Sequence, residues 1–402
     1  MIAYYLFFGF FGLMASLDYV KQNDYSLKLM RRIAFIFSFF LICFFVGFRY
    51  KIATDWISYL ELYTDSKLLD QLFIGKNLSF ANDSIEPGYK ILMSAIKSTG
   101  MNFFWFVFLI TLFNTFSLFY FLAKNQLRNK FVFLSIILIL TGFREFDILR
   151  QSIAFHIMLF AFNGKENRLA IQIPIIVLAM TFHYTAIIFG LFYLYQKFNL
   201  NRKVIIGLTV LYAISLFVTI PFITTILKAI VPLVGGVMAT IVNKAAGVVE
   251  GFNFQRNISF TSLLNLGFLI LLGSKNDKIV LSAAESVLVK MFLFYIIISI
   301  FFKEVQEVGD RLSYYFNFGI AFLFCLLPDL VKIREKRKLI LFVPIIFITM
   351  RLFLHFNDPA IWYGQSPYRN YFFSDQSDDR AIMERFDKMM NIGREQNEKK
   401  TN

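Results

Sequence analysis

The chain is poor in the residues that build metal sites and disulfide frameworks. Its 402 residues include two cysteines and three histidines, and only 17% are charged. Cys43 and Cys325 both lie in apolar surroundings, so neither a disulfide framework nor a thiolate metal site is expected. The sequence also lacks a phosphate-binding glycine loop, a nucleotide fingerprint and metal-ligand spacing. We therefore expect no metal, no cofactor and no nucleotide-sugar donor.

Apolar residues dominate what is present. They make up 57% of the chain, with 53 phenylalanines and a mean hydropathy of +0.61. These residues form dense blocks separated by short polar stretches, which is typical of a polytopic membrane protein. The net charge of +14 comes mostly from Lys and Arg in those short stretches, where the positive-inside rule accounts for them. We expect membrane lipids as partners and no nucleic acid.

The apolar blocks predict an all-α fold with about twelve transmembrane segments, some of them short or re-entrant. The blocks cover residues 2–17, 33–48, 103–123, 131–143, 151–162, 169–182, 184–196, 204–220, 259–273, 286–302, 312–330 and 339–355. The first block has no basic region before it and no cleavage site after it, so we expect a retained anchor. We predict one transmembrane domain over residues 1–355 and a polar tail over 356–402.

The distribution of basic residues predicts the orientation. With the N-terminus outside, the six loops assigned to the cytoplasm hold 19 Lys or Arg in 55 residues, against 13 in 108 residues of the outside loops. This bias follows the positive-inside rule. The tail would then lie outside as well. We expect a multi-pass membrane protein with this orientation.

Several blocks are too short to cross alone. Residues 131–142 would rise about 18 Å as a helix, against a hydrocarbon core of about 30 Å. The block 169–195 is broken at His183, with basic residues before and after it. We therefore predict pairs of short helices whose apices, at 144–150 and 181–184, face an outward-open cavity. The long outside segments 49–102 and 221–258 would shape this cavity, and Ser84 and Pro87 predict a helix start in the first of them.

Ionisable residues at membrane depth are costly, so those near the outer ends of the blocks are the functional candidates. They are Arg49, Asp55, Glu86, Arg144, Asp147, Arg150, His183, Asp310, Arg311 and Arg351. The topology above puts all of them on one side of the membrane. Their clustering on one side favours an enzyme over a transporter, whose charges would line a path open to both faces.

The chemistry of these residues suits a pyrophosphate and a hydroxyl. Arg144, Arg150 and the helix start at Gln151 are placed to bind an anion, and Arg311 next to Asp310 would add a third cation. A simple local pair between Asp147 and Arg150, or between Asp310 and Arg311, is the competing interpretation. His183, Asp55 and Glu86 are alternatives for a general base, each with a structural role as its alternative. Tyr59, Tyr89 and Tyr314 are candidates for contacts with sugars, or for interfacial packing.

Short motifs in this set resemble a known family. Phe48-Arg49-Tyr50 precedes Thr54-Asp55 and Tyr59, and Glu86-Pro87-Gly88-Tyr89, Arg150-Gln151 and Phe182-His183-Tyr184-Thr185-Ala186 follow in that order. Together they resemble the EpsG-like branch of the Wzy-type O-antigen and capsule repeat-unit polymerases. The resemblance is strongest over residues 40–195. The chain has Ala53 and Trp56 where the family often has Gly and Tyr around the Thr-Asp pair.

The resemblance implies a lipid-carrier-dependent, GT-C-like membrane glycosyltransferase. Such an enzyme joins undecaprenyl-pyrophosphate-linked oligosaccharides into O-antigen, capsular or exopolysaccharide on the outer face of the membrane, with a chain-length regulator and a flippase as pathway partners. The active site would face outward from the bacterial cytoplasmic membrane. The residues that would bind the glycan or its pyrophosphate are Arg49, Tyr59, Tyr89, Arg144, Arg150, Gln151, Arg311 and Tyr314. Two alternatives stay open: an O-antigen ligase acting on lipid A core, and a polysaccharide flippase.

Overall fold

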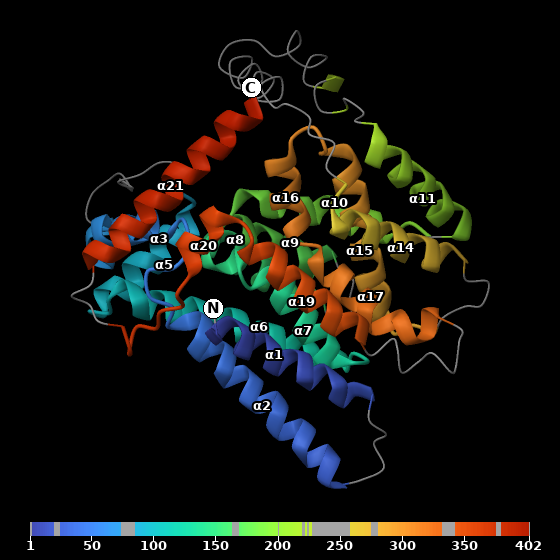
Figure 1. Ribbon diagram of the computed structural model, residues 1–402, viewed down its shortest axis with the longest axis horizontal. Helices are drawn as coiled ribbons and strands as arrows, with labels where there is room; N and C mark the ends of the chain where they lie inside the picture. Colours follow the sequence, from blue (N-terminus) through green and yellow to red (C-terminus); the bar gives the residue numbers. More distant parts are fainter. Residues whose placement is uncertain are drawn as a thin grey trace. The chain divides into compact units, whose positions relative to one another are not determined.

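The structure is a computed structural model that describes residues 2–19, 25–73, 85–162, 169–199, 201–218, 222, 225–226, 258–274, 280–331, 342–374 and 379–401 (Figure 1). Helices are the regular elements of these residues, together with one isolated β-bridge between Arg49 and Asn370. The predicted all-α class is therefore confirmed for the described part of the chain.

Each apolar block contains a helix. In chain order these are α1 (Ile2–Ser16), α2 (Tyr25–Gly47), α6 (Phe103–Asn125), α7 (Lys130–Thr141), α8 (Leu149–Leu159), α9 (Leu169–Met180), α10 (Ile188–Gln196), α11 (Arg202–Phe217), α14 (Phe260–Ser274), α15 (Ala283–Phe301), α16 (Gln306–Tyr314) with α17 (Asn317–Leu330), and α19 (Phe342–Phe356). The helix α2 starts at Tyr25, before its block begins at residue 33. Lys28, Arg31 and Arg32 are therefore helical, whereas the predicted topology has them in a loop.

The twelve predicted spans can be compared with the length and hydropathy of the described helices. Among the described residues, four helical stretches are long and apolar enough to cross: Ile2–Tyr19, Tyr25–Gly47, Phe103–Asn125 and Ala283–Phe301. A fifth would be the pair Val308–Tyr314 and Asn317–Leu330, which is bent by 56°. The other apolar helices are shorter, as predicted for 131–142. A polytopic membrane protein is supported, and the total of twelve spans stays a prediction.

The chain divides into two compact units, which we describe separately. Unit 1 comprises Met1–Leu191 and Glu335–Gly393, and unit 2 comprises Phe192–Arg334 and Arg394–Asn402. In unit 1, α1 and α19 both pack on α7, α2 packs on α6, and α8 packs between α6 and α9. The side chains from Phe131 to Thr141 are all buried, because α7 is apolar on every face and is covered on every face.

Short helices follow α2 in unit 1. They are α3 (Trp56–Asp65), α4 (Leu69–Phe73) and α5 (Pro87–Ser98). Pro87 occupies the first turn of α5, as predicted, and the N-cap is Glu86. Ser84, which we had considered as the cap, lies outside the described residues, as does most of the segment 221–258.

Unit 2 is built from α11, α14, α15, α16 and α17. A capping box starts α15, since the Ser282 side chain accepts from the Glu285 amide and the Glu285 side chain accepts from the Ser282 amide. Helices α15 and α17 pack closely where Gly319 lies against the backbone of Phe292. A Cβ at residue 319 would overlap that backbone, so the close approach requires glycine.

Two helices occupy the predicted tail. They are α20 (Pro359–Gln365) and α21 (Asp379–Thr401). Tyr4 near the start of α1 donates a hydrogen bond to the Gln365 carbonyl at 2.8 Å, and Tyr368 donates to the Phe45 carbonyl at 2.7 Å. The beginning of α1, the end of α2 and the segment after α20 therefore lie together in unit 1. The division of the chain at residue 356 stays a prediction.

Candidate functional site

The candidate site lies where the helices of unit 1 are interrupted. Glu86 stands at the start of α5, residues 144–150 join α7 to α8, and His183 follows α9. As predicted, helical breaks occupy both apices: the short 3-10 helices η2 (Arg144–Phe146) and η3 (Tyr184–Ile187) replace α-helix there. Backbone without regular pairing at a membrane surface is tolerated where other protein groups satisfy it. Such breaks also place side chains at the ends of helices.

Glu86 binds two basic side chains from different breaks. Its Oε2 accepts from Arg150 Nη1 at 2.5 Å, and its Oε1 lies 2.9 Å from His183 Nδ1. The Tyr184 amide also donates to Oε1, at 3.4 Å. Glu86 is only 2% exposed. A buried carboxylate with a guanidinium on one oxygen and an imidazole on the other fixes the position of both.

A glycine allows this arrangement to form. The Gly88 amide donates to the Thr181 carbonyl at 2.8 Å, which joins the first turn of α5 to the break after α9. A Cβ at residue 88 would overlap the Thr181 side chain and approach its carbonyl to 2.9 Å. The Glu86-Pro87-Gly88 sequence thus brings the carboxylate within reach of His183.

The electrostatics keep Glu86 ionised. Burial by itself would raise the pKa of this carboxyl, but the hydrogen bond from His183, the hydrogen bond to its own backbone and the charge of Arg150 outweigh it. The result is a pKa lowered to about 2. At neutral pH, Glu86 is therefore a carboxylate that accepts hydrogen bonds from its neighbours.

Two buried tyrosines lie close to Arg150. Tyr59 of α3 and Tyr89 of α5 form an edge contact with ring centroids 6.1 Å apart. Burial raises the pKa of both phenols, and the charge of Arg150 opposes the shift in each case. Both remain neutral hydrogen-bond donors. The Tyr89 hydroxyl and Arg150 Nε are buried atoms that have no hydrogen-bond partner among the described residues.

Asp147 organises a second polar group next to this one in the sequence. Its Oδ1 accepts from the Thr54 amide at 2.6 Å, from the Thr54 hydroxyl at 2.7 Å and from the Asp55 amide at 3.0 Å. Asp55 itself is exposed and is the N-cap residue of α3. Asp147 therefore holds Thr54 and Asp55 at the start of α3. From the sequence, Asp147 is a candidate whose one suggested partner is Arg150, three residues away.

In the structure, Asp147 and Arg150 bind different partners instead of forming the local pair. Arg150 binds Glu86, 64 positions away in the sequence, while Asp147 binds the Thr54-Asp55 segment. Both contacts are made across the fold. The α7–α8 turn thus connects two other interruptions of the helices.

Arg49 lies beneath this turn. It is 5% exposed and donates to the carbonyls of Val46 at 2.7 Å and of Glu145 and Phe146, both at 3.3 Å. Its guanidinium also lies over the Phe146 ring, 4.9 Å from the centroid. These contacts attach the end of α2 to the α7–α8 turn. A direct contact of Arg49 with glycan stays a prediction.

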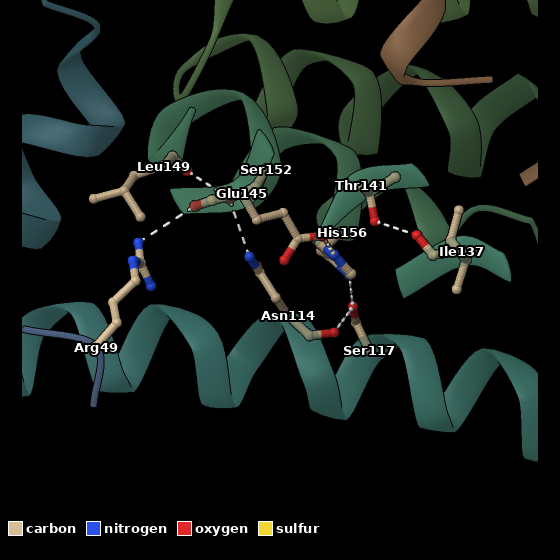
Figure 2. Close-up of polar contacts among 9 residues, drawn as sticks. All are labelled: Arg49, Asn114, Ser117, Ile137, Thr141, Glu145, Leu149, Ser152 and His156. Atoms are coloured by element: carbon tan, nitrogen blue, oxygen red, sulfur yellow. Dashed lines mark hydrogen bonds and ion pairs between the residues drawn. The ribbon is translucent and has the colours of Figure 1, made fainter. Parts of the chain in front are cut away.

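A buried polar network continues from the turn into the helices (Figure 2). His156 Nε2 lies 3.5 Å from Glu145 Oε1, and His156 Nδ1 lies 2.5 Å from Ser117 Oγ. Asn114 donates to Ser152 Oγ at 3.0 Å. From the sequence, His156 and His355 are weaker candidates than His183. A signal was available, since Asn114 and Ser117 are three apart and Ser152 and His156 four apart, which puts each pair on one helical face.

The other predicted site residues fall in two places. In unit 1, Arg144 is exposed in the α7–α8 turn, and Gln151 is 3% exposed in the first turn of α8. In unit 2, Arg311 is exposed on α16 and Tyr314 is fully buried at its end. The structure therefore brings Glu86, Arg150, His183, Tyr59 and Tyr89 together, and joins Asp55 to the same turn through Asp147. Arg311 and Tyr314 belong to the other unit.

This arrangement is suited to transferring a group with an anionic leaving group. Arg144 and Arg150 supply positive charge beside a helix start. With Nδ1 of His183 directed to Glu86, its Nε2 is available to accept a proton. Among the described residues, no three His, Cys, Asp or Glu side chains are arranged to hold a metal ion.

Comparisons with known proteins complete the description of the site. No curated protein and no solved structure matches the chain. A family model described as the EpsG family matches residues 32–370, which include every candidate site residue in both units. The match covers most of the chain. The chain belongs to the EpsG family.

Proposed function

We propose that this protein is a membrane glycosyltransferase that polymerises undecaprenyl-pyrophosphate-linked oligosaccharide repeat units. The product would be an O-antigen, capsular or exopolysaccharide made on the outer face of the cytoplasmic membrane. Membership of the EpsG family supports a polysaccharide polymerase-like function. The excess of basic residues in the opposite loops supports the outward orientation.

The observation that carries the proposal is the contact of Glu86 with both Arg150 and His183. Polymerisation needs a cation for the leaving pyrophosphate and a base for the attacking hydroxyl, at a fixed distance from each other. One buried carboxylate holds a guanidinium at 2.5 Å and an imidazole at 2.9 Å, which fixes that distance. A cluster with only a packing role would need neither side chain to be partly accessible, whereas the Arg150 side chain is 25% exposed and that of His183 13%.

In the proposed reaction, a sugar hydroxyl of the acceptor repeat unit attacks the anomeric carbon of the donor glycan. The bond from that carbon to the pyrophosphate oxygen breaks as the new glycosidic bond forms. Arg150 and Arg144 stabilise the negative charge that develops on the pyrophosphate. For Arg311 and Tyr314, which belong to unit 2, contact with the pyrophosphate stays a prediction from the sequence alone.

His183 is the favoured base. Its Nδ1–H donates to Glu86, so its Nε2 carries the lone pair that takes the hydroxyl proton. Glu86 then acts by orienting the imidazole, since a carboxyl with a lowered pKa is a weak proton acceptor. Asp55 is the alternative base because it is exposed and is held in place by Asp147. Arg49, Gln151, Tyr59 and Tyr89 are buried around this site, and their contact with glycan or pyrophosphate stays a prediction.

The test is polymerisation by the purified protein in nanodiscs. The undecaprenyl-pyrophosphate-linked repeat unit is supplied without nucleotide, and the products are separated on a gel. A ladder of repeat units is expected, with one undecaprenyl pyrophosphate released per added unit. Transfer only when lipid A core is supplied would support a ligase instead. Absence of transfer, together with movement of the lipid-linked unit across the bilayer, would support a flippase.

A further inference from the structure

The loop that presents Thr54 and Asp55 is strained. Lys51 and Ala53 have φ values of 50° and 85°, in the left-handed region that residues with a side chain rarely adopt. A β-carbon at such a φ approaches the backbone carbonyls closely, so the conformation persists only where surrounding contacts impose it. Ala53 directly precedes Thr54, whose amide and hydroxyl bind Asp147. The contacts that impose this conformation therefore also decide where Thr54 and Asp55 lie.

Those contacts come from the segment that follows α20. The Ala53 amide donates to the Gly364 carbonyl at 3.0 Å, and the Tyr50 amide donates to the Arg369 carbonyl at 3.0 Å. The Tyr371 amide donates in the opposite direction, to the Phe48 carbonyl at 2.7 Å. These backbone hydrogen bonds flank both residues of positive φ. Residues 364–371 thus act as a template for the strained loop.

The helix α21 holds this template in place. Arg385 donates to the carbonyls of Tyr363 and Ser366, on either side of Gly364. A Cβ added at Gly364 would lie 2.5 Å from Met389 Sδ, so α20 and α21 are in close contact there. The Ile382 side chain also packs with Tyr50 and Trp56. The helix therefore contacts both the template and the loop.

We propose that α20 and α21 are a positioning element of the site, with Arg385 as its key residue. Arg385 fixes the Gly364 carbonyl, which holds Ala53 at positive φ, and this presents Thr54 and Asp55 to Asp147. The inference rests on the proposed function, because it assigns the C-terminal helix a role in the same reaction. It also puts α21 on the same side of the membrane as the site. The family match ends at residue 370, so α21 acts from beyond the matched residues.

The test compares two arginines of α21 in the full-length protein. Arg385→Ala removes the contacts to Tyr363 and Ser366, whereas Arg380→Ala removes an exposed arginine whose side chain is 93% accessible. Loss of hydrogen bonds from a charged group corresponds to about a tenfold or larger effect. We expect Arg385→Ala to polymerise about tenfold more slowly and its amides at residues 50–55 to exchange hydrogen faster. Arg380→Ala should match the wild type in both measurements.

A second substitution tests the role of strain. Glycine adopts positive φ without a steric penalty, so Ala53→Gly should keep the loop conformation when the template is loosened. We expect Ala53→Gly to restore polymerisation by Arg385→Ala at least threefold, and to change the wild type less than twofold. If Arg385→Ala does not fold, Gly364→Ala replaces it, because the added Cβ would overlap Met389 Sδ. Its control is the double variant Gly364→Ala with Met389→Ala, which restores the space.

The outcomes separate this inference from the proposed function. Hydrogen exchange is measured without substrate, so unchanged exchange at residues 50–55 in Arg385→Ala would overturn the inference. Faster exchange with an unchanged polymerisation rate would overturn it too, because the loop would then not position the site. A wild-type protein that forms no ladder would instead overturn the proposed function.

Discussion

The two units satisfy their buried polar groups in different ways. In unit 1, side chains from separate helical breaks bind one another, as Glu86 binds Arg150 and His183. In unit 2, Lys290 and Lys303 donate to the backbone carbonyls of Gln196 and Ser215. The first arrangement holds ionised groups in a defined relative geometry, while the second satisfies carbonyls near helix ends. The cross-helix network of ionised side chains that carries the proposed reaction therefore lies in unit 1.

The largest expected effect comes from removing the Arg150 guanidinium. Loss of one group that stabilises a developing negative charge typically costs two to three orders of magnitude in rate. Arg150→Ala should therefore reduce polymerisation about 100-fold or more. Arg150→Lys should retain part of the activity, because it keeps the charge but loses the fixed geometry.

The control for this prediction is the amount of folded protein in the membrane. Both Arg150 variants should elute as the wild type does in size-exclusion chromatography, since Arg150 is partly exposed. Full-length polymer made at the wild-type rate by Arg150→Ala would remove Arg150 from the reaction.

The Glu86 carboxylate makes the stability of the wild type depend on pH in a defined direction, and Glu86→Gln removes this dependence. The folded-state pKa is lowered from 4.5 to about 2, which corresponds to roughly 3 kcal/mol of stabilisation by the charged form. This stabilisation is complete above pH 4.5 and is lost as the pH falls towards 2. The difference in melting temperature between wild type and Glu86→Gln should therefore be constant from pH 5 to 7 and shrink below pH 4.5.

Glu61→Gln is the matched control, since Glu61 is exposed on α3. It should leave the melting temperature unchanged across this range. A difference between wild type and Glu86→Gln that grows below pH 4.5 would show that the carboxylate is not stabilised by its neighbours.

A packing substitution in unit 2 tests whether helix packing there affects stability without affecting the reaction rate. A methyl group at Gly319 would overlap the Phe292 backbone, whereas one at Gly267 has open space within 4 Å. Gly319→Ala should lose about 1–3 kcal/mol of stability, as overpacked cores do, and Gly267→Ala should lose almost none. The polymerisation rate per folded molecule should stay the same in both. Loss of rate without loss of stability in Gly319→Ala would contradict a role for Gly319 in helix packing alone.

The smallest expected effect is that of Arg311→Ala. Arg311 is exposed on α16, and its contact with the pyrophosphate stays a prediction from the sequence alone. Its removal should slow polymerisation about tenfold, as expected for an accessible hydrogen bond to an anion. The measurement is the initial rate at saturating repeat unit. An effect as large as that of Arg150→Ala would contradict the placement of the main reacting residues in unit 1.

Much of the fold could be predicted from the sequence because apolar blocks have few alternatives to helix in a membrane. The positions of α6, α7 and α8 differ from the predicted blocks by a few residues. The break at His183 was also predictable, since two basic ends enclose one apolar run. The number of spans was not, because length alone does not show which short helices cross the membrane.

The site could be predicted as a set of residues but not as a set of contacts. Ionisable groups near helix ends identified Glu86, Arg150 and His183, yet their pairing depends on Gly88 meeting Thr181 across the fold. The three-residue spacing of Asp147 and Arg150 leaves a local pair open, whereas in the structure Asp147 binds Thr54 and Asp55. The positive φ of Ala53 leaves no signal in the sequence, and neither does its hydrogen bond to Gly364.

The most direct measurement is photo-crosslinking of the purified protein with an undecaprenyl-pyrophosphate oligosaccharide that carries a photoreactive group beside the pyrophosphate. The labelled peptide should contain the α7–α8 turn, residues 144–150, and Arg150→Ala should abolish this label. Labelling that is absent from the turn, or that is unchanged in Arg150→Ala, would contradict the assignment of the reacting centre to unit 1.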